Sequence, residues 1–599
     1  MAAKKIPLRS EVNSGDKWDL APLYENNSEW EKDFEKLKSS LNSYDRYMNR
    51  LAESPEIFLE LFEFDLETGR LLEKLYTYSH LKNDEDKTDS EYVAMHQKIS
   101  MLYTSISEKS SFITPEIQSL SGEIIENYLS HEKISKYRYA IEKIIKFKPH
   151  TLDGEKEKLL SATSDIAGSA SAIFSQLNNS DLSFGEITGD DGITNELSHG
   201  NFITFLSSQN RELRKTAFFQ FYDTFDRHKN TIATSLYYSN RADWIYSKLR
   251  NYSGCRKASL FKDNVDETVY DNLCETVKNN LKPLSAYLDY RKKSLNLDEL
   301  HIYDIYVPLV KEIEFSMSYD EAVETCIEAL RPLGNEYCSI LSDGLKSGWV
   351  DRYENKGKRS GAYSSGCYDS NPYILMNYNE KNIDSVYTLI HEAGHSMHSY
   401  YSCKNQDYVY HNYTIFVAEV ASTFNEFLLT RYLLKKFADN PQMKKYILNR
   451  EIDNIRSTLI RQTMFAEFEK ITHEYVENDR PLPLDAIRKE YRKLLEIYFN
   501  GSIVIDDILE LEALRIPHFY SSFYVYKYAT GISAAIALGK KAVENKNNEI
   551  KSYLDFLKLG GSMDPLDELK TAGVDMSTSI PVTAALEYFG ELVDLLIKS

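Results

Sequence analysis

The chain has 599 residues, which is enough for two to four ordinary domains or one large multi-lobed fold. Its net charge of −20 argues against a nucleic-acid-binding protein, because phosphates are bound by patches of Lys and Arg. Glycine (24) and proline (15) both break helices and are scarce, so the composition predicts a mainly helical fold.

Neither a secretory leader nor a membrane segment is expected. The basic pair Lys4-Lys5 precedes no apolar run, and no apolar stretch reaches the ~20 residues that span a bilayer. The six cysteines include no C-x-x-C pair, so a cysteine zinc site is not expected. A chain of this length needs no disulfide framework, and we expect reduced thiols and a cytoplasmic location.

The N-terminal part of the chain has the pattern of antiparallel helices. Apolar residues at helical spacing run from Trp30 to Tyr44, and Ser28 with Glu31 predicts a capping box where that helix begins. Comparable stripes, separated by turn signals, continue to about residue 175.

A turn signal at Asp190-Asp191-Gly192 interrupts the helices and predicts a small β-hairpin. We place a domain boundary here. It separates an N-terminal helical domain, residues 1–190, from a second domain, residues 191–599.

A second strand-like zone lies further along the chain. Small residues at 361–367 precede a β-prone segment at 373–378, and Pro372 suits the edge of a sheet. Such an edge can bind an extended peptide by its main chain, although an ordinary hairpin explains the pattern equally well.

The motif His391-Glu392-Ala393-Gly394-His395 follows an apolar run. On a helix, His391 and His395 lie one turn apart on one face, where two neutral imidazoles can bind a single divalent ion. Glu392 lies beside them, where it can take a proton from a water that the metal activates. The plain alternative is a helix with two polar residues one turn apart by chance.

A second helix, at about 414–437, carries Glu419 and Glu426 two turns apart on one face. Its apolar neighbours predict that it is largely buried, where a carboxylate is costly unless it is paired or metal-bound. Glu419 is therefore the best candidate for a third zinc ligand, which leaves the fourth position for water. His398, one turn after His395, is interpreted as a supporting or core residue.

The segment 515–531 is rich in aromatic residues. A peptide hydrolase needs donors aimed at the oxyanion of its tetrahedral intermediate, and His518 or a tyrosine hydroxyl can serve. Spacing alone favours a plain aromatic core segment. The alternating Tyr524, Tyr526 and Tyr528 are typical of a strand, whereas the alanine-rich run that follows is typical of a helix.

Together these motifs resemble the M3 metallopeptidases, and among them the oligoendopeptidase F subgroup. The resemblance extends over nearly the whole chain. It is carried by residues 17–20, 391–398, 416–426, 461–469 and 516–531. It implies a mainly α, zincin-like (gluzincin) fold: a multi-helix bowl with a deep central channel and a small β-sheet or hairpin beside the active site.

The resemblance also implies one Zn²⁺ per chain, with His391, His395 and Glu419 as its ligands and Glu392 as the general base. The helix with the two histidines is expected at about 383–402, and the site helices together lie at about 383–437.

His518 and the tyrosines after it resemble the family's substrate and transition-state contacts. Among Tyr520, Tyr524 and Tyr526, we favour Tyr526 first and Tyr520 second.

The predicted function is zinc-dependent hydrolysis of internal bonds in short peptides, with no nucleic-acid or membrane partner. Two alternatives stay open. One is a helical zinc carboxypeptidase or dipeptidyl carboxypeptidase, and the other is a peptide-binding protein with a structural zinc. An intact base at Glu392 and only three strong ligand candidates argue against the non-enzymatic alternative.

Overall fold

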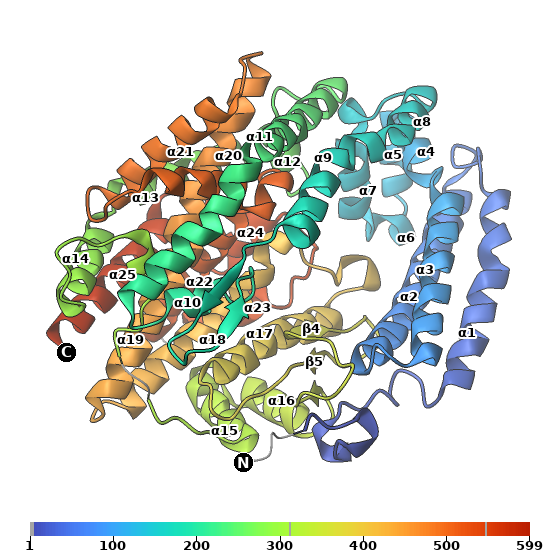
Figure 1. The fold of residues 1–599 in the computed structure, drawn as a ribbon. Helices are drawn as coiled ribbons and strands as arrows, with labels where there is room; N and C mark the ends of the chain where they lie inside the picture. The colour runs from blue at the N-terminus through green and yellow to red at the C-terminus, as the bar shows by residue number, and fades with distance from the viewer. Residues whose placement is uncertain (1–4, 311–312, 545–547) are drawn as a thin grey trace. The chain divides into compact units, whose positions relative to one another are not determined.

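The structure is a computed structural model that describes residues 5–310, 313–544 and 548–599. Helices make up most of it and the strands are short, which confirms the predicted mainly helical fold (Figure 1). The chain divides into two compact units. The first comprises Met1–Thr151, Glu314–Tyr432 and Leu538–Gly573, and the second comprises Leu152–Ile313, Leu433–Ala537 and Val574–Ser599. The domain boundary placed at residue 190 stays a prediction.

The first unit is helical with one small sheet. Its elements are α1 (Asn27–Ser40), α2 (Pro55–Glu85), α3 (Ser90–Ser110), α4 (Ile113–Ser119), α5 (Gly122–Leu129), α6 (Glu132–Ser135), α7 (Arg138–Lys146), α15 (Tyr319–Leu330), α16 (Asn335–Lys346), β3 (Val350–Asp351), β4 (Tyr363–Ser365), β5 (Tyr373–Leu375), α17 (Asp384–Asn405), α23 (Asn548–Phe556) and α24 (Pro565–Thr571). Helices α18 (Ile415–Lys436) and α22 (Tyr526–Glu544) continue across the division between the units.

The second unit is also helical. Its elements are α8 (Gly154–Ala162), α9 (Ser164–Gln176), β1 (Glu186–Thr188), β2 (Thr194–Glu196), α10 (Phe202–Leu206), α11 (Arg211–Leu249), α12 (Cys255–Phe261), α13 (Glu267–Asn279), α14 (Lys282–Ser294), α19 (Pro441–Ile455), α20 (Gln462–Glu477), α21 (Leu484–Phe499) and α25 (Ile580–Lys598). Strands β1 and β2 pair antiparallel on either side of the turn at 190–192, which confirms the predicted hairpin.

Helices α1, α2 and α3 lie side by side in the first unit (Figure 1). The apolar stripe of α1 is buried against α2, where Trp30 Nε1 donates to Leu75 O at 2.9 Å. The predicted capping box is wrong, because the Asn26 side chain caps this helix by accepting from the N–H groups of Ser28 and Glu29. Asn and Ser are caps of similar strength, so the sequence alone does not separate the two positions.

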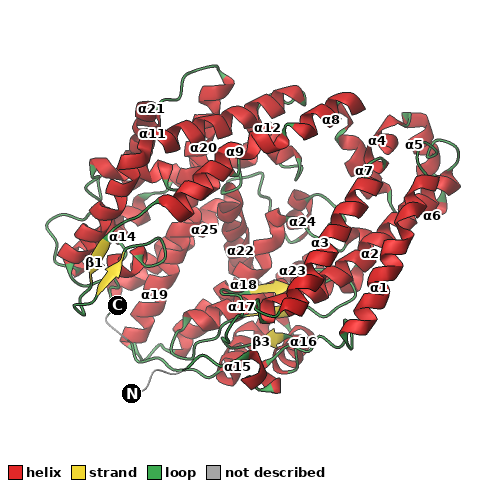
Figure 2. Ribbon diagram, turned by 45° about the vertical axis from the view of Figure 1, so that its right-hand side comes forward, coloured by secondary structure: helices red, strands yellow, loops and turns green. Residues whose placement is uncertain are grey.

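The sheet of the first unit has the strand order β3-β5-β4. Helices α16 and α17 pack against it, and α15 packs on these two helices (Figure 2). Strand β5 is thus central, and the prediction that residues 373–378 form an edge is wrong. The Ile374 N–H donates to Trp349 O, on the β3 side, at 2.8 Å. Ser364 of β4 is the partner of Ile374, so its own backbone groups point away from β5. The edge of the sheet beside α17 therefore belongs to β4.

Among the described residues, every helix is too short or too polar to cross a bilayer.

Candidate metal centre

The His-Glu-x-x-His motif lies in the middle of α17. Val386, Leu389, Ile390 and Ala393 fix the orientation of the helix, since each is 0% exposed. The 3.6-residue period then places His391 and His395 on the same face, one turn apart. Both rings remain partly accessible, with side-chain exposures of 27% and 19%.

Helix α18 supplies the third group, and one glycine sets how closely it approaches α17. A Cβ added at Gly394 would lie 2.6 Å from Ser422 Cα and 2.7 Å from Ala421 O. No side chain fits at that position, so the two helices touch backbone to backbone. This contact brings Glu419, one turn before Ser422, to the pair of histidines.

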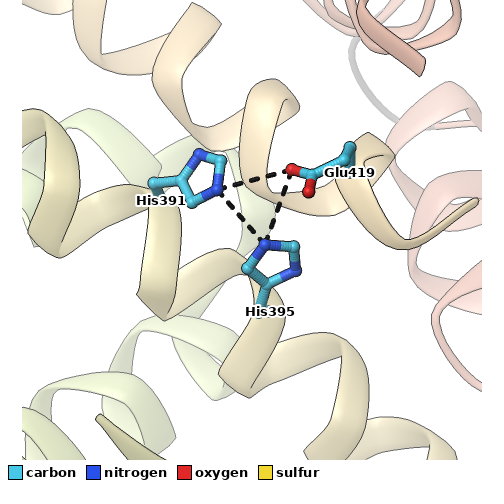
Figure 3. A group of neighbouring side chains, drawn as sticks. All are labelled: His391, His395 and Glu419. Carbon is cyan, nitrogen blue, oxygen red and sulfur yellow. Dashed lines mark hydrogen bonds and ion pairs between the residues drawn. The ribbon is translucent and has the colours of Figure 1, made fainter. Parts of the chain in front are cut away.

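The three side chains converge on one point (Figure 3). Nε2 of His391 lies 3.2 Å from Nε2 of His395, and the Glu419 Oε2 atom lies 3.4 Å and 3.6 Å from these two nitrogens. Ligands bound tetrahedrally at about 2.0–2.1 Å from zinc would be roughly 3.3–3.4 Å apart. Among the described residues, no other group of three His, Cys, Asp or Glu side chains gathers this closely. The donor set and its spacing therefore fit a zinc ion.

Glu426 supports the site from behind. Its Oε1 lies 2.6 Å from Nδ1 of His391, so an Nδ1–H donates to it and Nε2 is directed toward Glu419. Burial lowers the pKa of His391, but the hydrogen bond to Glu426 and the nearby carboxylates outweigh it and raise this pKa to about 9. For His395, burial and the neighbouring His391 lower the pKa to about 4. Three carboxylates thus surround two imidazoles, and a bound dication would offset this excess of negative charge.

Glu392 is buried, with 8% of its surface exposed, on the side of α17 that faces β4. Burial is the main reason why its pKa rises to about 7, and Glu419 raises it further. The proximity of His391 and a hydrogen bond from the Ser364 backbone N–H oppose this rise. A carboxyl group that titrates near neutral pH can both accept and return a proton.

His398 lies in the core, which is one of the two places interpreted for it from the sequence. It is 1% exposed, and its ring stacks on Tyr413 with the centroids 3.7 Å apart. Burial lowers its pKa to about 3, so the ring is neutral.

The predicted transition-state contacts all lie in the second unit, around the start of α22. His518 has Tyr524 and Tyr528 as ring neighbours, with centroids 6.1 Å and 5.9 Å away, and Tyr528 Oη lies 3.5 Å from His518 Nε2. Tyr526 instead is 0% exposed and packs on Tyr270 at 5.2 Å. The roles of His518 and Tyr526 stay predictions, and burial is a physical argument against Tyr526 as a substrate contact.

Tyr520 also lies outside this cluster, since its ring stacks on Phe174 at 4.3 Å. Tyr528 was named in the sequence but was not among the three tyrosines weighed as contacts, although it lies beside His518. A helical pattern over this segment would put residues 524 and 528 on a face that residue 526 does not share, although Tyr524 itself lies in the turn before α22.

Replacing Gly394 with Ala is expected to weaken zinc binding about 10- to 100-fold, the range seen when groups that orient a metal ligand are lost. The added methyl group has to push α18 away from α17, which displaces Glu419 from the two histidines. Competition with a zinc-binding dye measures the affinity. Gly168→Ala in α9 is the matched control, because its new Cβ meets nothing within 4 Å. Wild-type zinc affinity in Gly394→Ala would show that the close approach does not set the site.

Family models assign most of the chain. The model described as peptidase family M3 matches residues 204–588, and the model described as oligopeptidase F matches residues 116–184. The first match contains the whole of α17 and α18.

Related proteins match this chain along almost its full length. Oligopeptidase PepF of Bacillus subtilis is 44% identical over 99% of this chain and 88% of its own. A solved chain from Chlamydophila abortus has a TM-score of 0.93 at 38% identity, covering 99% of this chain and 100% of that one. For oligoendopeptidase-F from Enterococcus faecium the TM-score is 0.74 at 34% identity, with coverages of 96% and 99%. The chain therefore belongs to peptidase family M3 and, within it, to the oligoendopeptidase F group.

Proposed function

We propose that this metalloendopeptidase binds one zinc ion through His391, His395 and Glu419 and hydrolyses internal bonds of short peptides. The observation that carries the proposal is the triangle of ligand atoms, 3.2–3.6 Å on each side, next to the buried carboxyl group of Glu392. When bound, zinc supplies a Lewis acid that polarises water and the peptide carbonyl. The names of the relatives, oligopeptidase and oligoendopeptidase, support short peptides as the substrates.

Glu392 acts as the general base in this proposal. Its pKa of about 7 lets the carboxylate take a proton from the attacking water at neutral pH. The protonated carboxyl group then gives that proton to the nitrogen of the leaving amine. The buried position keeps bulk water away from the proton and strengthens its interactions.

Strand β4 holds the substrate in an extended form. Its outer edge at Ser364 offers a backbone C=O beside α17, and a peptide main chain can pair with it as an added strand. Ser364 Oγ lies 2.8 Å from Ser396 Oγ, which fixes this edge to the metal helix.

His518 is proposed as a donor to the oxyanion of the transition state, as its place in the motif suggests. Its Nε2 is near the Tyr528 hydroxyl, and both side chains are partly exposed. This makes Tyr528 and Tyr524 better candidates for its partners than the buried Tyr526.

We also propose a reducing, cytoplasmic setting. All six cysteines are free thiols, which supports it.

Mass spectrometry of the products from short peptides blocked at both ends tests the proposal. Zinc-loaded protein is expected to cut them at internal bonds, and a chelator is expected to abolish the cutting. An intact folded protein serves as the comparison and is expected to survive. Release of one or two residues only from peptides with a free C-terminus would favour the carboxypeptidase alternative. Binding of peptides without cleavage would favour the peptide-binding alternative.

A further inference from the structure

The backbone of Phe523 has an unusual conformation. Its φ is +57°, and every other non-glycine residue with a positive φ in the described chain is Asn or Asp. This region is unfavourable for a bulky side chain, so surrounding contacts have to maintain it. Phe523 lies between His518 and Tyr528, in the turn that leads into α22. The strained residue therefore connects the two halves of the proposed donor cluster.

Glu469 of α20 holds this conformation directly. Its Oε1 accepts a hydrogen bond from the Phe523 backbone N–H at 2.6 Å. The carboxyl group is 1% exposed, and its Oε2 has no hydrogen-bond partner. Burial raises the pKa of Glu469 to about 8, so the group is mainly neutral at pH 7. Burying a carboxyl group costs free energy, and the hydrogen bond from the Phe523 N–H offsets part of that cost.

A second set of contacts holds Ser522, the residue before Phe523. His473, one turn after Glu469, lies with Nδ1 2.8 Å from Glu469 O and Nε2 3.3 Å from Asp243 Oδ2. The same Asp243 oxygen accepts from Ser522 Oγ. The ring of Phe523 rests on His473, with the centroids 4.7 Å apart. Side chains of α11 and α20 thus fix both Ser522 and Phe523.

Hydrogen bonds within the turn link the fixed backbone of Phe523 to the cluster of His518, Tyr524 and Tyr528. The Ser521 N–H donates to His518 O at 2.9 Å, and the Tyr524 N–H donates to Ser521 O at 3.2 Å. Rotation of Phe523 to a negative φ would change the direction of the chain between these residues. His518 and Tyr528 would then no longer meet as they do now, 3.5 Å apart.

We propose that Glu469 is a positioning residue for hydrolysis, which acts through the Phe523 backbone to hold Tyr524 and Tyr528 against His518. The inference rests on the proposed role of His518 in the reaction. It adds a residue that does not touch the substrate.

The test compares two variants of the full chain. Glu469→Leu removes the acceptor and keeps most of the volume, whereas Glu469→Gln keeps a carbonyl oxygen for the Phe523 N–H. Glu469→Leu is expected to lower kcat about 10- to 100-fold with zinc content unchanged, because small misplacements of reacting groups cost this much. Glu469→Gln is expected to stay within about threefold of wild type. Equal kcat values for the two variants would overturn the inference.

A double-variant cycle separates positioning from general stability. With His518→Ala already present, Glu469→Leu is expected to lower kcat little further, while its effect on Tm stays the same. Additive losses of kcat would show that Glu469 does not act through His518. If His518→Ala lowers kcat but Glu469→Leu does not, only this inference fails. If His518→Ala leaves kcat unchanged, the proposed role of His518 fails and the inference fails with it.

A measurement that needs no turnover tests the inference even if the protein cleaves none of the peptides tried. The NMR signal of the His518 ring, assigned by its loss in His518→Ala, is expected to shift in Glu469→Leu and to stay in place in Glu469→Gln. An unchanged signal in Glu469→Leu would overturn the inference whatever the activity. Should that variant not fold, Glu469→Met, whose flexible side chain fills the same space without an acceptor, replaces it.

Discussion

Replacing Glu392 with Gln is expected to lower kcat for a short peptide about 10³-fold while zinc stays bound at one ion per chain. A general base contributes about 10²–10⁴-fold, and 10³-fold corresponds to about 4 kcal/mol of transition-state stabilisation. Gln has the same shape and hydrogen-bonds in the same place, but it cannot take the proton. The buried site accepts it readily, since burial already disfavours the charged form of Glu392.

Zinc analysis and steady-state kinetics on the same sample check this expectation. Glu336→Gln, in a side chain that is 74% exposed on α16, is the matched control and should behave as wild type. A Glu392→Gln variant with substantial turnover would rule out Glu392 as the base. A variant that loses its zinc would show instead that Glu392 belongs to the ligand set.

Replacing His395 with Ala is expected to remove the metal and with it the activity. His395 Nε2 forms two sides of the ligand triangle, at 3.2 Å from His391 and 3.6 Å from Glu419. Groups that merely orient a ligand are worth 10- to 100-fold in metal affinity, so loss of a ligand itself should cost at least about 100-fold. Zinc measured after dialysis should fall far below one ion per chain, and kcat should fall with it.

His398→Asn provides the contrast on the same helix. His398 is a core residue stacked on Tyr413, so its loss should lower Tm but leave bound zinc at the wild-type level. Stoichiometric zinc in His395→Ala would mean that the ligands are other than the three proposed.

The metal helices are the part of the structure that the sequence predicts best. The expected ranges, about 383–402 and 414–437, lie within a few residues of α17 and α18. The reason is physical: helical spacing alone brings His391 and His395 together, and burial of α18 makes an isolated carboxylate costly. The close contact at Gly394 was not predicted, because it depends on which residue of α18 lies opposite.

The tyrosines show where local patterns fail. Tyr524, Tyr526 and Tyr528 alternate as in a strand, but α22 begins at Tyr526 and the preceding residues form a turn. Tyr526 of α22 is buried in the core, whereas Tyr524 in the turn and Tyr528 in the helix both lie beside His518. Both readings were open in the sequence, and tertiary packing decides between them.

The sheet shows a similar limit. Pro372 immediately precedes β5, and proline is tolerated both where a strand begins and at an edge. The order β3-β5-β4 arises because Val350 and Asp351, residues without a strong strand pattern, pair with β5 from the other side. A local motif does not predict contacts between segments that are far apart along the chain.

Titration of zinc into chelator-treated protein, with bound metal and internal peptide cleavage followed together, tests the central claim most directly. We predict that cleavage is absent without metal, rises in proportion to bound zinc and reaches its maximum at one ion per chain. Full cleavage by the metal-free protein, or a maximum that needs a second ion, would contradict the proposed single site of His391, His395 and Glu419.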